Sequence, residues 1–196
     1  MKLRHQLMFA AAMVLPFALW PQTAAPRQSV VEYTAGGQLK VPENYREWVF
    51  LSSGLGMTYG PAAQGAETHL MFDNVFVNPD GYRGFLQTGK WPDKTMFVLE
   101  IRGSKTNASI NKGGHTQGDV HDIEVEVKDA SAKTGMWTFY GFPGGKAFPA
   151  SATCYQCHGK NTAVENTFVQ FYPTLMPVAQ KMGTLKSDFG KPGFSK

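Results

Sequence analysis

The chain has 196 residues, a net charge of +4, 17% charged residues and 13% aromatic residues. This length suits one domain with a sizeable core, and the aromatic content excludes a disordered chain. Charged residues are scarcer than the roughly 25% of an average soluble domain. The 21 glycines and 12 prolines favour strands and loops over a helical bundle.

Residues 42–51 predict a helical turn that leads into a strand, and the Gly/Ala-rich residues 54–65 predict a loop. Residues 69–77 are rich in Phe and Val and predict a second strand. A helix follows, because Asn78-Pro79 is a typical helix start and Gly89 a typical left-handed stop.

The second half of the chain predicts three more strands. They cover residues 95–102, 123–128 and 135–142, and a long Gly/Ser/Asn/Lys loop is expected over 103–119. In 123–128 the apolar residues alternate with charged ones, which predicts a half-buried strand with its charges in solvent. Residues 160–183 suit one or two helices. The order of elements predicts an α+β fold, a single domain with a mainly antiparallel β-sheet and a few helices.

Residues 1–25 are typical of a secretory signal sequence. Two basic residues precede the apolar stretch Leu7–Trp20, and the small residues at 23–25 suit cleavage. The alternative is an uncleaved anchor, but the stretch contains Pro16 and is shorter than the ~20 residues of a membrane span. We therefore expect export to the periplasm and no membrane span after signal removal.

Three further segments complete the expected organisation. They are an exposed lead-in over 26–40, a single domain over 41–185 and a flexible tail over 186–196. Removing the two basic residues of the signal lowers the net charge from +4 to +2. The remaining positive charge is dispersed, so we expect no nucleic-acid partner.

The only cysteines, Cys154 and Cys157, are followed directly by His158. C-x-x-C-H is the attachment signature of a c-type haem. Two thiols at this spacing on a tight turn reach the two vinyl groups of one haem, and the adjacent histidine becomes the proximal ligand of the iron. The sequence therefore predicts one covalent haem c in each chain.

Three other interpretations compete for the cysteine pair. A thioredoxin-type redox pair belongs at the start of a helix after the first strand of a βαβ unit, whereas this pair follows the sheet. A zinc site would need a second pair of ligands of this kind. A disulfide between such close neighbours would close too short a loop to stabilise the fold much. The pattern favours the haem.

The residue opposite His158 would decide what such a haem does. The sequence leaves five- and six-coordination open, because many side chains could supply a sixth ligand. The candidates are Met57, Met71, Met96, Met136, Met176, Met182, His69, His115 and His121. Small helical electron-transfer cytochromes carry the haem motif near the amino terminus. Here it lies late, behind a sheet, which favours a gas-binding or catalytic haem.

Several motifs together resemble the cytochrome P-460 family. They are Pro42-x-Asn44-Tyr45-Arg46-Glu47-Trp48, the Asn78-Pro79 helix followed by Gly89, Val125-x-Val127-Lys128-Asp129, Trp137-x-Phe139-Tyr140, Cys154-x-x-Cys157-His158-x-x-Asn161 and Phe168-x-x-Phe171-Tyr172-Pro173-x-Leu175. The resemblance covers nearly all of the chain after the signal. It implies an antiparallel sheet over a five-coordinate haem c, usually in a homodimer. Members of that family include hydroxylamine-oxidising cytochromes P-460 and gas-binding cytochromes c′-beta.

One departure from the family pattern concerns Leu99. Oxidising members cross-link a lysine to the haem ring from this strand, and by register Leu99 stands at that position. Lys94 and Lys105 lie outside the register. Leucine has no nucleophile, so the resemblance implies a haem without the cross-link. Phe72, Phe97 and Leu99 would form an apolar distal wall that favours neutral diatomics such as NO or CO.

Glu124 lies at or near the position of a distal carboxylate of the oxidising members, where it could relay protons. The alternative is that Glu124 is a solvated glutamate on a strand. The same alternative applies to Glu126, for which the sequence gives less support for a functional role. Three functions therefore remain open. They are a periplasmic NO-binding haem protein, an oxidoreductase acting on hydroxylamine, NO or peroxide through Glu124, and an electron carrier with a periplasmic electron-transfer partner.

Overall fold

The computed structural model describes residues 31–58, 70–132 and 136–191. The predicted signal sequence, His69 and the last five residues lie outside this part of the chain. The described residues form an antiparallel sheet with three α-helices, so the predicted α+β fold is confirmed. None of the helices in these ranges is long and apolar enough to cross a membrane.

The sheet is a meander in which each strand pairs with the next one along the chain. Its strands are β1 (Val49–Leu55), β2 (Met71–Val77), β3 (Met96–Lys105), β4 (Thr116–Lys128), β5 (Trp137–Phe142) and β6 (Lys146–Ala147). The longest pairing joins β3 to β4 at the centre of the sheet. The short strand β6 has no counterpart in the sequence prediction.

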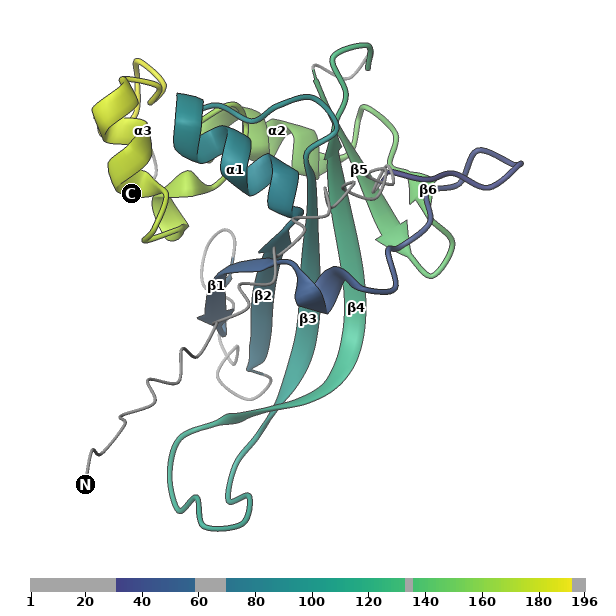
Figure 1. Ribbon diagram of the computed structural model, residues 1–196. Helices are drawn as coiled ribbons and strands as arrows, with labels where there is room; N and C mark the ends of the chain where they lie inside the picture. Colours follow the sequence, from purple (N-terminus) through teal and green to yellow (C-terminus); the bar gives the residue numbers. More distant parts are fainter. Residues whose placement is uncertain (1–30, 59–69, 133–135, 192–196) are drawn as a thin grey trace, which may run out of the picture.

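The helices are α1 (Pro79–Thr88), α2 (Thr153–Asn161) and α3 (Met176–Met182), with short 3-10 turns η1 (Tyr45–Glu47) and η3 (Val169–Phe171). All three helices gather at one end of the sheet (Figure 1). As predicted, α1 begins with Pro79 and ends at Gly89, whose φ of 68° is left-handed. Asn78 does not cap the helix through its side chain, because its Oδ1 accepts the N–H of Met96 at 2.9 Å.

The prediction of a long loop over residues 103–119 is wrong. Strands β3 and β4 continue as far as the pair Lys105 and Thr116, so only the tip of the hairpin is irregular. This hairpin forms an arm that extends away from the helices (Figure 1). The sequence here is polar and lacks the apolar alternation of a half-buried strand. Backbone pairing with a neighbouring strand determines the structure instead.

The two faces of the sheet are both covered. One face, here called the helix face, carries Val77, Phe97 and Phe139 and packs against the helices. The other, here called the N-terminal face, packs against residues such as Leu39 and Trp48. Because the helices also cover one end of β4, its charged positions there are not in solvent. The expected half-buried strand is therefore a strand buried on both faces at this end.

A polar network lies within the N-terminal face. Its centre is Glu100, which is 2% exposed and accepts hydrogen bonds from Tyr45, Arg46 and Arg102. Asn74 Nδ2 approaches the same carboxylate at 3.4 Å. Burial alone would raise the pKa of Glu100, but these hydrogen bonds outweigh it and lower the pKa to about 2. The network ties the segment before β1 to the centre of the sheet.

Candidate functional site

The cysteine motif lies on a helix, not on the tight turn expected from its spacing. Helix α2 carries Cys154 and Cys157 one turn apart, so both thiols lie on the same side of the helix. Both are free and partly exposed. The helix is fixed to the sheet by Tyr155, whose hydroxyl accepts the N–H of Phe139 at 3.4 Å and donates to the carbonyl of Phe148 at 3.3 Å.

The thiol environment differs from that of a redox-active pair. Burial raises the pKa of the Cys154 thiol. Catalytic thiols of disulfide oxidoreductases need the opposite shift, because the thiolate is the reacting form. The two partly exposed thiols lie on one side of the helix, where a ligand can alkylate both. They lie at the start of a helix, as a thioredoxin-type pair does, but the raised pKa of Cys154 and the antiparallel sheet before the helix differ from that class.

His158 is held in the state that binds a metal. Its Nδ1 lies 2.9 Å from the carbonyl oxygen of Asn166, and a carbonyl can only accept, so Nδ1 carries the hydrogen. Asn166 has a left-handed φ of 64°, a conformation that asparagine tolerates well. Burial lowers the pKa of His158 to about 4, although the hydrogen bond with Asn166 acts in the other direction. The ring is therefore neutral at pH 7, with the Nε2 lone pair left for a ligand.

Aromatic rings fix the plane of this imidazole. The rings of Phe139 and Phe168 meet it edge-on, with centroids 4.6 and 4.7 Å away. Phe139 belongs to the helix face of the sheet, and Phe168 lies in the segment that follows α2. The imidazole of His158 is thus packed between the sheet and the next segment of the chain.

A lysine from the end of the domain closes the carboxyl end of α2. Lys186 Nζ donates to the carbonyl of Gly159 and to Thr162 Oγ1, both at 2.8 Å. It also lies 3.4 Å from the carbonyl oxygen of His158. A cation at this end of a helix also interacts favourably with the helix dipole. The last described segment therefore stabilises the helix that carries the motif.

Glu126 lies beside His158, which the sequence did not suggest. Its Oε2 is 3.5 Å from Nδ1 of His158 and has no hydrogen-bond partner in the described structure. Glu126 is 9% exposed, so the expected solvated glutamate is wrong at this position. Burial, and then the charge of Glu124, raise the pKa of Glu126 to about 8. No signal in the alternating sequence distinguishes Glu126 from Glu124, because their burial differs only through the helices that cover one of them.

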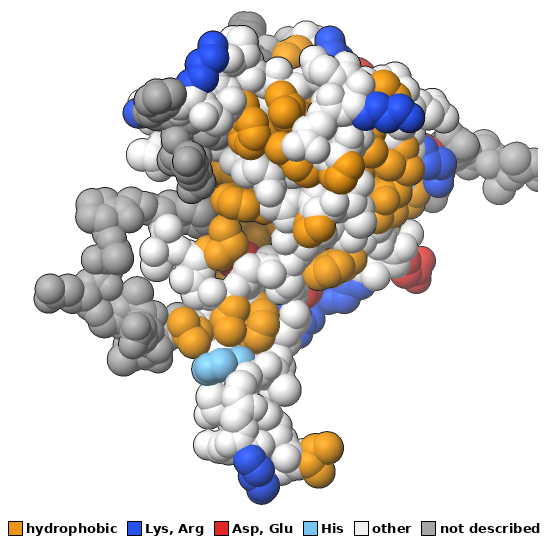
Figure 2. Space-filling model, turned by 90° about the vertical axis from the view of Figure 1, so that its left-hand side faces the viewer, with side chains coloured by type: hydrophobic (Ala, Val, Ile, Leu, Met, Phe, Trp, Pro, Cys, Tyr) orange, Lys and Arg blue, Asp and Glu red, His pale blue; other side chains and the backbone are white. Residues whose placement is uncertain are grey.

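Leu99 and Glu124 are direct neighbours. They pair across β3 and β4 and both lie on the helix face, one row further from the helices than Phe97. Leu99 is partly buried and Glu124 exposed. Desolvation by the surrounding protein raises the pKa of Glu124, and the charges of Asp122 and Asp73 add to it. Figure 2 shows hydrophobic side chains on one side of the molecule around a hollow that contains an acidic side chain.

The proposed apolar wall is not one surface. Phe97 lies on the helix face but is 2% exposed, and its ring packs against those of Trp91 and Trp137 with centroids 4.7 and 5.7 Å away. Phe72 pairs with Arg102 and therefore points to the N-terminal face, away from Leu99. Successive residues of a strand point to opposite faces of the sheet, and Phe72 and Leu99 point to different faces. The prediction that they share one wall is therefore wrong.

The sheet also separates the candidate sixth ligands. Met71 lies on the helix face, two residues before Asp73, whereas Met96 is fully buried on the N-terminal face. Met57 folds back over β1, where its sulfur occupies the space beside Gly54. Histidines 115 and 121 are exposed on the arm. The remaining described candidates are Met136, Met176 and Met182, of which the first and last are exposed.

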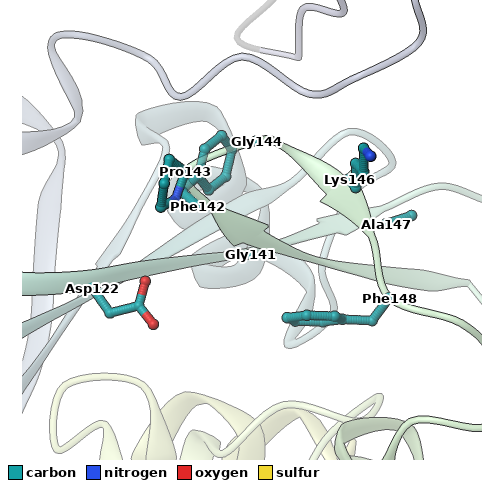
Figure 3. A pocket seen from close by; sticks show the side chains of 8 residues that line it. All are labelled: Asp122, Gly141, Phe142, Pro143, Gly144, Lys146, Ala147 and Phe148. Carbon is teal, nitrogen blue, oxygen red and sulfur yellow. The ribbon is translucent and has the colours of Figure 1, made fainter.

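A hollow of about 520 Å³ opens at the turn between β5 and β6. Figure 3 shows Asp122 and Phe148 on one side of the strand ribbon, with Gly141 between them. Gly141 pairs with Glu124, so the hollow adjoins the row that contains Leu99. A Cβ at Gly141 would lie 2.8 Å from the ring of Phe148, so glycine is needed for this ring to cover the strand.

These residues fit a haem. Two accessible thiols on one side of a helix, followed by a neutral histidine with its Nδ1 held by a carbonyl, are the donor set of a c-type haem protein. Cys154 and Cys157 would hold the haem and His158 would bind its iron.

The comparison with known families agrees with this class. The family model described as Cytochrome P460 matches residues 42–169, nearly two thirds of the chain. The chain belongs to the cytochrome P460 family, as the resemblance in the sequence predicted, and its expected cofactor is haem. No relative among the curated proteins matches the chain.

Proposed function

We propose that this protein is an exported c-type haem protein that binds NO or a related diatomic gas. One haem is attached through Cys154 and Cys157, and His158 is the proximal ligand of a five-coordinate iron. No lysine–haem cross-link forms, because Leu99 stands at the cross-linking position. The haem supplies an open iron position for the gas, and the chain supplies the environment of that position. The protein is a periplasmic homodimer, as the family resemblance implies.

The observation that carries the proposal is a group of apolar side chains on β2 and β3 around Leu99. Val75, Leu99 and Ile101 lie on the helix face and are all partly exposed. None of these side chains can donate a hydrogen bond or attack the haem ring. Neutral diatomics such as NO and CO bind without such a donor, whereas bound O₂ and peroxide depend on polar support. These apolar side chains therefore favour gas binding over oxidation, whereas the carboxyl of Glu124, which pairs with Leu99, favours the second function below.

Optical spectra of the purified holoprotein test this function. We expect a five-coordinate ferrous spectrum, a ferrous Soret band without the red shift that names the P-460 family, and a new spectrum on addition of NO. Mass spectrometry of the haem peptide should show two thioether bonds and no third link. A red-shifted ferrous Soret band, or a six-coordinate low-spin ferric spectrum, would contradict the proposal.

A second function is favoured by the position of Glu124. This carboxyl is exposed beside Leu99, and its raised pKa brings it closer to the pH range in which it can exchange protons. It could serve as the proton relay of an oxidoreductase acting on hydroxylamine, NO or peroxide, with a periplasmic electron acceptor as partner.

The assay for the second function supplies hydroxylamine and a soluble electron acceptor to the holoprotein. Steady reduction of the acceptor that falls in Glu124→Gln but not in Glu43→Gln, a change at an exposed glutamate before η1, would support the oxidoreductase. Absence of turnover in the unmodified protein would remove it.

A further inference from the structure

Glu126 is a buried carboxyl whose Oε2 has no hydrogen-bond partner among the described residues. It pairs with Phe97 on β3 and with Phe139 on β5, so its backbone is fixed at the centre of the sheet. Its two lateral neighbours on the helix face are aromatic, and neither can donate a hydrogen bond from its side chain. An apolar side chain of similar size would suit these surroundings better. The packing of the sheet therefore gives no reason for a carboxyl at this position.

The imidazole of His158 lies beside the free oxygen. Oε2 of Glu126 lies 3.5 Å from Nδ1, and the carbonyl oxygen of Asn166 lies 2.9 Å from the same nitrogen. Nδ1 carries one hydrogen, which the carbonyl of Asn166 accepts, and the carboxyl oxygen lies beside it without a hydrogen bond of its own. In apolar surroundings such an interaction is stronger than in water.

The packing keeps the two groups together. The ring of Phe139 lies against His158 and belongs to the residue that pairs with Glu126. The ring of Phe168 meets the imidazole as well, and Lys186 holds the end of α2. Neither the carboxyl nor the imidazole can move into solvent without disturbing these contacts.

We propose that Glu126 is a positioning residue for the proximal histidine, its carboxyl oxygen lying beside the Nδ1–H that the carbonyl of Asn166 accepts and strengthening the imidazole as a ligand of the haem iron. The inference rests on the proposed function, in which His158 binds the iron. No proton is transferred. A partly negative oxygen beside Nδ1–H increases electron density at Nε2, which would strengthen the iron–histidine bond and stabilise ferric over ferrous haem. A neutral carboxyl also retains an acceptor oxygen, so this role does not depend on ionisation.

Two spectroscopic readouts of the holoprotein test the inference. They are the iron–histidine stretching frequency of the ferrous protein by resonance Raman spectroscopy and the midpoint potential of the haem. In Glu126→Leu we expect a lower stretching frequency and a higher midpoint potential, since the polar oxygen beside Nδ1–H is lost. Glu126→Met makes the same test with an unbranched apolar side chain, should the branched one disturb the fold. Glu126→Gln retains an acceptor oxygen and should restore both readouts at least in part.

Asp122→Leu is the matched control. Asp122 lies on the same strand and face as Glu126, but it is exposed and four residues away. Removing its charge should leave the stretching frequency unchanged.

Two results would overturn the inference: unchanged readouts in folded Glu126→Leu or Glu126→Met, or an equal frequency shift in Asp122→Leu. Failure of the proposed function itself is distinguishable, because the unmodified protein would then show no iron–histidine band.

Discussion

Replacement of Glu100 by glutamine tests the polar network that connects the segment before β1 to the sheet. The carboxylate is 2% exposed and accepts hydrogen bonds from Tyr45, Arg46 and Arg102. An amide in its place has no charge to offset the two guanidinium groups. Because Arg46 is half exposed, water can hydrate it in the variant, which places the cost at the lower end of the range for a broken buried pair.

The magnitude follows from the shift in pKa. The pKa of Glu100 falls from 4.5 to about 2 on folding, a difference worth about 3 kcal/mol of unfolding free energy. Because the folded-state pKa is the lower one, this stabilisation is fully present above pH ~5 and is lost as the pH falls towards 2. Glu100→Gln should therefore be less stable by about 3 kcal/mol at pH 7 and equal to the unmodified protein near pH 2.

Urea unfolding of the two holoproteins, followed by circular dichroism between pH 2 and 7, measures this difference directly. Both proteins carry the same haem, so changes in its ligation at low pH largely cancel in the comparison. Glu47→Gln, at an exposed position in the same short segment, is the control and should match the unmodified protein. A loss of stability in Glu100→Gln that stays constant down to pH 2 would refute the reasoning.

Two further substitutions probe the surroundings of α2. Lys186→Met removes the cation that donates to the carbonyl of Gly159, and we expect this change to lower the unfolding free energy by about 2 kcal/mol. Hydrogen exchange in α2, measured by mass spectrometry, should become faster. Unchanged exchange would show that α2 does not depend on Lys186. Phe97→Ala opens the aromatic core below α2 and should cost about 3–5 kcal/mol in urea unfolding, whereas Phe50→Ala, at a side chain that is 52% exposed, should cost far less.

Local signals in the sequence were enough for several elements of the fold. The start of α1 at Pro79 and its end at Gly89 follow from backbone preferences that act within a few residues. The hairpin arm was missed for the opposite reason. Residues 103–119 have loop composition, and their strands exist because β3 and β4 pair with each other over the whole length of the hairpin.

The candidate site likewise contains some residues that the sequence could predict and others that it could not. The spacing of Cys154, Cys157 and His158 is a chemical requirement of haem attachment, so it could be read from the sequence before any fold was known. Which carboxyl lies beside the histidine could not be read, because Glu124 and Glu126 occupy equivalent positions in one alternating run. Their environments differ only because α2 and its neighbours cover one row of the sheet and leave the next one open.

The sequence by itself therefore determined the family and its haem cofactor, and it predicted the residues that would attach the haem. These depend on residue types at short, fixed spacings, and such spacings are local. Only the tertiary structure decided that Phe72 faces away from Leu99, that Glu126 is buried against His158 and that Lys186 closes the carboxyl end of α2. Each of these depends on which distant segments lie in contact, and strand register and helix docking set such contacts.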